Sequence, residues 1–262
     1  MTASASTHSA TGTFAPHPGA APILRRIAAQ TGMELRLTLR RGESVLLTLV
    51  IPVLLLIGLS TVEVINVEGS RIDFFTPGIL ALAIMSTAFT GQAIATGYER
   101  QYGVLKQLGA SPLTRAGLLT AKTAAVIVLE IGQLAVLAVV ALLLGWAPHG
   151  SPLAVAALVL LGTAAFSGLG LLLAGSLRAE ATLAGANLIW FLFLVSGGVL
   201  FPLSGFSDGV SEALGWLPLP ALAEGLRSIL QAGSGLPGSD LVVLLIWAAV
   251  LLVGAAVTFR WE

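Results

Sequence analysis

Residues 123–146 read TAAVIVLEIGQLAVLAVVALLLGW, a run in which Glu130 is the one ionisable side chain. A bilayer core of about 30 Å needs about 20 mainly apolar residues in helical form, so the run predicts a membrane-spanning helix. The composition of the chain agrees with this prediction, because 56% of the 262 residues are hydrophobic and 10% are charged. Soluble domains carry about 25% charged residues.

Five further segments of similar length and apolarity surround this run. The six expected spans are residues 44–62, 74–97, 123–146, 153–176, 183–203 and 240–259. The predicted fold class is therefore an all-α integral membrane domain over residues 22–262. Residues 1–21 contain no Asp, Glu, Lys or Arg and are rich in Ala, Ser, Thr, Gly and Pro. We expect them to form a disordered tail and not a signal peptide.

The distribution of Lys and Arg predicts the orientation of the spans. With the N-terminus inside, 11 of the 13 basic residues fall in inner segments, and only Arg71 and Arg227 fall outside. The outer segments also hold seven acidic residues. A multi-pass protein of a cell membrane with both termini in the cytoplasm is therefore predicted. The bias toward Ala, Leu, Gly and Val, with scarce Lys, is typical of a high-GC bacterial genome.

Residues 22–43 form a basic amphipathic stretch before the first span. Leu24, Ile27 and Leu35 fall near one face of a helix, while Arg25 and Arg36 reach water or lipid phosphate. Such a helix lies in the plane of the membrane interface. It is either a simple anchor for the first span or also the border of a docking surface for a cytoplasmic partner, and the pattern leaves both interpretations open.

The interval 98–122, YERQYGVLKQLGASPLTRAGLLTAK, is polar and lies between the second and third spans. Val104, Leu105 and Leu108 cluster on one side of a predicted short helix. Pro112 disfavours helical geometry at Ser111, so we expect Ser111 to cap a helix that begins at Pro112 and enters the third span. An ordinary charged loop is the alternative interpretation.

Two motifs in the chain resemble those of ABC-2 type permeases. Residues 99–112 match the approximate pattern E-R-x-x-G-[TV]-L-[KE]-x-L-x-x-[ST]-P of the loop after the second span in that family. Residues 218–227 match P-[LF]-x-x-x-x-[DE]-[GA]-[LF]-R in the outer segment after the fifth span. The resemblance extends over residues 24–260. The short first outer loop, 63–73, makes the chain similar to the small six-span permeases of the antibiotic and daunorubicin-resistance type.

The resemblance implies that the interval 98–122 is a coupling helix, which inserts into a groove on a separate ATP-binding subunit. The residues expected to make that contact are Glu99, Arg100, Gly103, Leu105, Lys106 and Leu108. It also implies an assembly of two permeases, as a homodimer or with a paralogue, and two ATPase subunits that bind ATP and Mg. Short re-entrant helices in the outer segment 204–236 are expected to close the outer end of the path.

The chain itself offers no ATP-binding or catalytic motif. No G-x-x-x-x-G-K-[ST] occurs, and neither Lys106 nor Lys122 follows a glycine. The chain has no cysteine, and its three histidines, His8, His17 and His149, lie in the tail and in a short turn. We therefore expect no cofactor, no metal site and no enzymatic activity in this chain, and no nucleic-acid partner.

Three polar residues within the expected spans are candidates for a substrate path: Glu130, Gln133 and Gln92. An ionisable residue at this depth suggests a functional site, although a hydrogen-bonded contact between helices is the other interpretation. The function expected is export of a hydrophobic or amphipathic drug, antibiotic or lipid, driven by a partner ATPase. The alternatives are a secondary transporter or channel, which more often shows inverted repeats, and an intramembrane enzyme, which needs a paired catalytic constellation.

Overall fold

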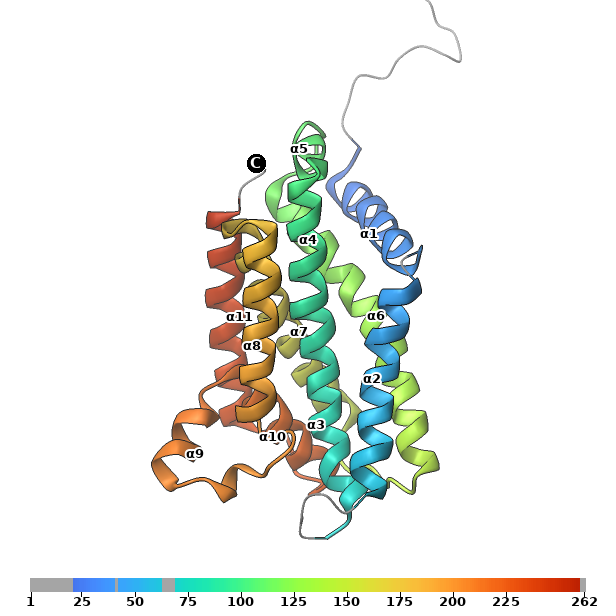
Figure 1. Ribbon diagram of the computed structural model, residues 1–262, viewed down its shortest axis with the longest axis vertical. Helices are drawn as coiled ribbons and strands as arrows, with labels where there is room; N and C mark the ends of the chain where they lie inside the picture. The colour runs from blue at the N-terminus through green and yellow to red at the C-terminus, as the bar shows by residue number, and fades with distance from the viewer. Residues whose placement is uncertain (1–20, 41, 63–68, 260–262) are drawn as a thin grey trace, which may run out of the picture.

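A computed structural model describes residues 21–40, 42–62 and 69–259, and these residues form helices and turns with no strand among them (Figure 1). In chain order the helices are α1 (Ile23–Arg40), α2 (Gly42–Thr61), α3 (Arg71–Met85), the π-helix η1 (Ser86–Gly91), α4 (Gln92–Gln101), α5 (Val104–Gly109), α6 (Arg115–Leu143), α7 (Pro152–Ser176), α8 (Ala179–Ser196), the 3₁₀ turn η2 (Leu203–Gly205), α9 (Asp208–Gly215), α10 (Pro218–Leu230) and α11 (Gly238–Thr258). The tail expected at 1–21 lies almost entirely outside the described residues.

The all-helical membrane fold is confirmed. Five helical stretches in the described chain are long and apolar enough to cross a membrane: Arg71–Gln101, Arg115–Leu143, Pro152–Ser176, Ala179–Ser196 and Gly238–Thr258. Helix α2 contributes a shorter apolar stretch, Thr48–Thr61, at the place of the first expected span.

The largest differences between the helices and the expected spans lie in α6 and α8. Helix α6 begins at Arg115, before the expected third span at 123–146, and it is the helix that was expected to begin near Pro112 and to enter that span. The fifth span ends at Ser196 and not at residue 203. It is followed by Gly197 and Gly198, and Gly198 has a φ of 68°, in the left-handed region that glycine adopts without steric cost.

The two ends of the bundle carry different charges. Figure 1 places α1, α5 and the end of α11 together, with α9 and α10 at the opposite end. Among the described residues, the basic ones at the first end are Arg25, Arg26, Arg36, Arg40, Arg100, Lys106, Arg115, Lys122 and Arg178. The opposite end has Arg71 and Arg227. We call the first end the basic end and the opposite one the far end.

The second span joins the two ends through the middle of the bundle. It consists of α3, η1 and α4 in one continuous helical stretch. In the π-helix η1 the backbone hydrogen bonds skip one more residue than in an α-helix. Its polar side chains bind neighbouring spans: the Trp190 indole donates to Ser86 Oγ at 2.9 Å, and Thr87 Oγ1 donates to Gln133 Oε1 at 2.8 Å.

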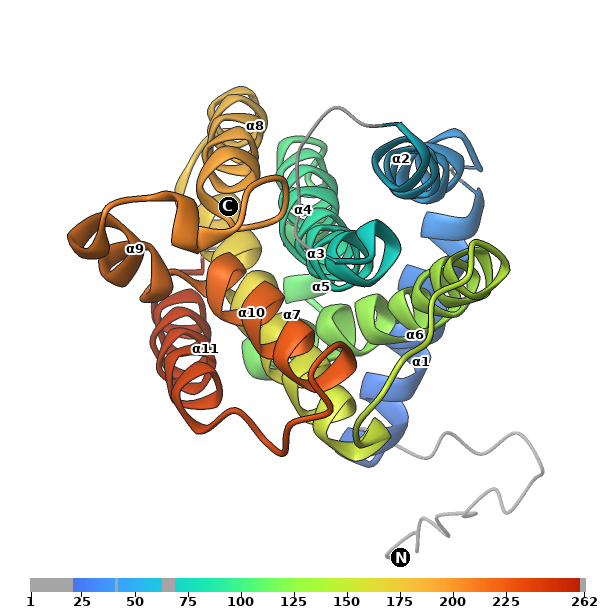
Figure 2. The same ribbon diagram turned by 90° about the horizontal axis from the view of Figure 1, so that it is seen from below.

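Helix α10 covers the far end of the bundle. It is amphipathic and buried over most of its length, and it begins with Pro218 in its first turn, where proline is favoured. Figure 2, seen from this end, shows α10 lying across α7, between α3 and α11. Together α9 and α10 supply the short helices predicted for the segment 204–236.

Candidate functional site

The segment 98–122, which we call the coupling segment, forms the tip of the basic end (Figure 1). Helix α4 ends at Gln101, and Gly103 then turns the chain into α5 with a φ of 73°. A Cβ added to Gly103 would meet nothing within 4 Å. Glycine is therefore favoured here by its backbone conformation and not by a lack of space.

The turn after α5 corrects one prediction. Ser111 does not cap the next helix: its hydroxyl donates to the carbonyl oxygen of Leu108 at 2.6 Å and accepts from the Leu113 N–H at 3.3 Å, and both contacts lie before α6 begins. Helix α6 begins three residues after Pro112, and its cap is Thr114, whose hydroxyl accepts from the Gly117 N–H at 3.1 Å. Pro112 therefore lies in the turn between α5 and α6 and is not the first residue of α6.

An apolar contact fixes α5 to the bundle. Leu105 is fully buried in a small cluster that is separate from the main core. The other buried members of this cluster are Leu118, Leu119, Leu171, Ala255 and Phe259. They come from α6, α7 and the end of α11, and the partly buried Leu108 packs beside Leu105, so α5 is packed against these three spans through two leucines.

Arg100 ties α4 to the end of α7. Its Nη1 donates toward the carbonyl oxygens of Gly175, Leu177 and Ala174 at 3.1, 3.2 and 3.4 Å. The last carbonyls of a helix have no partner within the helix, and a cation there also complements the helix dipole. The arginine therefore holds the coupling segment against the end of a neighbouring span.

A buried ion triad joins three helices at the same level. Lys122 of α6 has 4% of its surface exposed. Its Nζ lies 2.6 Å from Glu99 Oε2 of α4 and 3.1 Å from Glu34 Oε2 of α1. The amide of Gln30 donates to the other oxygen of Glu34 at 2.8 Å. Buried charges are stable only when paired and hydrogen-bonded, so these contacts depend on one another.

Helix α1 attaches to the coupling segment by its polar side. Besides Glu34, Arg26 donates to the carbonyl oxygen of Pro112, and Thr31 donates to that of Ala121 at 3.3 Å. Several of its apolar side chains, such as Leu24 and Leu39, are exposed, while Ile27 and Leu35 are partly buried. This arrangement suits a helix in the interface plane, and it also makes α1 part of the unit that holds α4, α5 and α6.

The predicted contact residues therefore divide into two groups. Glu99, Arg100 and Leu105 face the protein interior, and Leu108 packs partly against the Leu105 cluster. Of the predicted set, Lys106 has its side chain on the exposed side of α5.

Two tyrosines that were not predicted extend the exposed side of the coupling segment. Tyr102 has 75% of its surface exposed, and its ring stacks on that of Tyr98 with the centroids 6.2 Å apart. The exposed aromatic pair and Lys106 form what we call the outward face of the coupling segment.

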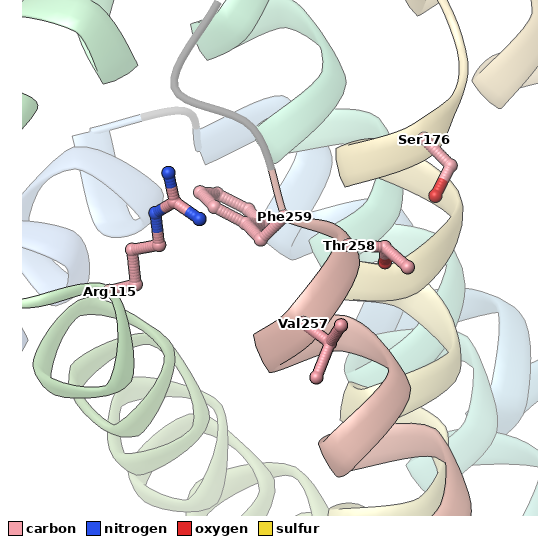
Figure 3. A pocket seen from close by; sticks show the side chains of 5 residues that line it. All are labelled: Arg115, Ser176, Val257, Thr258 and Phe259. Atoms are coloured by element: carbon pink, nitrogen blue, oxygen red, sulfur yellow. The ribbon is translucent and has the colours of Figure 1, made fainter.

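A cavity of about 600 Å³ opens beside this segment (Figure 3). Its lining residues are Arg115, Ser176, Val257, Thr258 and Phe259. Figure 3 shows the Arg115 side chain reaching toward the Phe259 ring. Since Phe259 also belongs to the Leu105 cluster, the cavity wall and the inner side of α5 are in contact.

The polar residues within the spans are closed off in this conformation. Glu130 is 1% exposed and accepts a hydrogen bond from Thr163 at 2.5 Å. Gln133 accepts from Thr87 and donates to the carbonyl oxygen of Thr48 at 2.9 Å. Gln92 is also buried, on α4. Each of these three hydrogen bonds joins two different spans, and neither Glu130 nor the two glutamines line the cavity of Figure 3.

The comparison with known families decides the class of protein. The family described as ABC-2 family transporter protein matches residues 57–257, which include the second span, the coupling segment and α10. This chain belongs to the ABC-2 transporter permease family. It is thus a multi-pass membrane subunit of an ABC transport system, and the family in general works with an ATP-binding cassette partner. A comparison with curated proteins found no match.

The sequence did not identify every residue of this permease site. Glu34 is the one acidic residue among residues 1–42, in a stretch that is otherwise basic. An isolated acid of this kind signals a buried ion pair. The backbone partners of Arg100 and Arg227 gave no such signal, because every residue carries a carbonyl oxygen.

Proposed function

We propose that this permease is the membrane-spanning subunit of an ATP-driven exporter in a bacterial plasma membrane, with the basic end in the cytoplasm. The cargo is a hydrophobic or amphipathic compound such as a drug, an antibiotic or a lipid. Energy enters through a separate ATPase, which binds ATP and Mg, and the permease works with a second copy of itself or a paralogue. The Lys and Arg bias between the two ends supports this orientation.

The observation that carries the proposal is the construction of the coupling segment. Its inner side is fixed to α1, α6 and α7 by Leu105, Arg100 and the Lys122 triad. Its outward face ends in Tyr102 and Lys106. Tyr is enriched at protein interfaces, where lysine is depleted, so the tyrosine pair is the stronger indication of a partner. A force on the outward face would be transmitted to α1, α6 and α7, because the contacts on the inner side are buried.

The test is capture of an ATPase and transport by the captured complex. The permease is co-expressed with the ATP-binding cassette protein encoded beside it, purified and placed in liposomes with a fluorescent amphiphile. We expect the ATPase to co-purify and the amphiphile to move only with ATP. Uptake or release driven by an ion gradient, in liposomes that contain the permease alone, would instead establish the secondary transporter.

A matched pair of charge reversals locates the contact. Lys106→Glu changes the outward face, whereas Arg178→Glu changes an exposed residue at the same end but outside the coupling segment. We expect Lys106→Glu to lower the amount of co-purified ATPase and Arg178→Glu to leave it unchanged. Equal loss in both variants would show that net charge, and not the coupling segment, governs capture.

A further inference from the structure

Arg227 connects three separate parts of the far end. It lies on α10 with 8% of its surface exposed. Its Nη2 donates to the carbonyl oxygen of Gly198 at 3.0 Å, and its Nε donates to that of Phe74 at 3.5 Å. The guanidinium carbon is 4.3 Å from the centroid of the Phe74 ring, within the range of a cation–π contact. One side chain therefore joins α10 to α3 and to the turn that follows α8.

The turn held by Arg227 seals the space between α3 and α10. A Cβ added to Gly78 of α3 would lie 3.2 Å from the Cα of Val199, so the two backbones are in contact. A Cβ added to Gly197 would lie 2.5 Å from Leu219 Cδ2 of α10. Val199 itself is fully buried. Residues 197–199 therefore form a close-fitting wedge at the far end.

Open space lies directly beside the wedge. A cavity of about 440 Å³ is lined by Phe74, Pro202, Leu203, Glu224 and Arg227. Arg227 thus stands between this cavity and the sealed interior of the bundle.

The pairing of Arg227 also makes the contact reversible. Its carboxylate partner, Glu224, is on the same helix one turn earlier. The ion pair can therefore move with α10, and the arginine keeps a counter-charge when α10 leaves α3. Opening breaks the contact of Arg227 with the Phe74 ring and its hydrogen bonds to two uncharged carbonyl groups, and water from the cavity can replace the two hydrogen bonds. An arginine without Glu224 would be left as an unpaired charge, which is strongly unfavourable when buried.

We propose that Arg227 is the latch of the far end: a positioning residue that holds the wedge 197–199 against α3 and α10 and lets go when the transporter opens. The inference rests on the proposed transport function, because a latch matters only if the far end opens during export.

Cysteine labelling tests the latch, because the chain has no cysteine of its own. Three single-cysteine reporters are purified in nanodiscs and treated with a water-soluble maleimide. Val199→Cys reports on the wedge. Ala141→Cys reports on buried packing elsewhere, on α6, and Leu236→Cys is an exposed reference for complete labelling.

Arg227→Gln is compared with Arg71→Gln on each reporter. Arg71 is a matched control, because it lies at the same end, donates to the carbonyl oxygen of Leu59 at 2.8 Å and lies 5.5 Å from the Phe75 ring centroid. We expect Arg227→Gln to raise the labelling rate at Val199→Cys about tenfold, since the loss of one charged hydrogen bond changes an equilibrium by at least that factor. Arg227→Lys should give an intermediate rate, because it keeps the charge but cannot reach both carbonyls.

Three results would overturn the latch. These are an unchanged rate at Val199→Cys in Arg227→Gln, an equal increase in Arg71→Gln, and a parallel increase at Ala141→Cys, which would indicate a general loss of packing. With the ATPase present, ATP should raise the rate at Val199→Cys in the parent and add nothing in Arg227→Gln. No increase in the parent would overturn a role in the transport cycle. The labelling without ATP needs no partner, so its failure leaves the proposed function standing, and failure of ATPase capture leaves the labelling result intact.

Discussion

The two ends of the permease are both held by an arginine that binds backbone carbonyls, but they differ in what surrounds it. At the basic end, Arg100 is accompanied by the Lys122 triad and the buried Leu105, so that α1, α4, α5 and α6 are joined by several independent contacts. At the far end, among the residues that the structure describes, the side-chain hydrogen bonds between α10, α3 and the wedge come from Arg227, beside the apolar packing of Val199 and Leu219. The basic end is thus held by several side-chain hydrogen bonds and ion pairs, whereas the polar contacts across the far end converge on one residue.

Loss of the triad should have the largest effect. Lys122→Met removes the buried ammonium group that Glu34 and Glu99 share, and breaking a buried pair in this way costs about 3–5 kcal/mol. We expect a much lower thermal melting temperature for the purified permease.

The second lysine provides the control for this change. Lys106→Met alters an exposed residue and should shift stability by no more than about 0.5 kcal/mol. Adding Glu34→Gln and Glu99→Gln to Lys122→Met should restore part of the lost stability, because the triad then contains no charged side chain. Equal melting temperatures of Lys122→Met and Lys106→Met would mean that the stability of the basic end does not depend on the triad.

Arg100→Gln should have the next largest effect, through coupling. The change removes charged hydrogen bonds to the end of α7, and such bonds are worth about 1.5–3 kcal/mol each. We expect the ATPase to remain bound and to hydrolyse ATP, while the amount exported per ATP falls. Arg178→Gln, at an exposed position of the same end, should leave this ratio unchanged. If the amount exported per ATP is unchanged in Arg100→Gln, Arg100 only caps the end of α7 and has no part in coupling.

Gly103→Ala should have a smaller effect, of about 1–2 kcal/mol, because alanine is strained at a φ of 73°. The same change at Gly132, within α6 and also with nothing within 4 Å of a Cβ, should stabilise by about 0.5–1 kcal/mol. Changes of opposite sign in the free energy of unfolding of the two variants, measured by chemical or thermal unfolding, would show that backbone geometry holds the tip of the coupling segment. A neutral Gly103→Ala would show that α5 can turn in another way.

Glu130→Gln should have the smallest effect. Glutamine keeps an acceptor for the Thr163 hydroxyl, so we expect stability to change by less than about 1 kcal/mol. We expect the variant to export cationic and neutral compounds at the same rates as the parent permease. Selective loss of cationic export would place Glu130 on the substrate path and not in a contact between spans.

The sequence was sufficient for the spans and for the location of the coupling segment, because both depend on local hydropathy and charge. It was not sufficient for the direction in which the segment faces. The spacing of Glu99, Arg100 and Leu105 defines positions on a helix, but only the neighbouring α1, α6 and α7 decide that these positions are buried. The helix expected to begin at Pro112 begins at Arg115, because Thr114 and not Ser111 supplies its cap.

The π-helix of residues 86–91 determines how the two halves of the second span are rotated about their common axis. Each residue in an α-helix turns the chain by about 100°, and a π-helical turn takes up one residue more than an α-helical turn. The phase of α4 is therefore shifted relative to α3. This shift lets one span present the Phe74 carbonyl to Arg227 at one end while it directs Glu99 to Lys122 and Arg100 to α7 at the other.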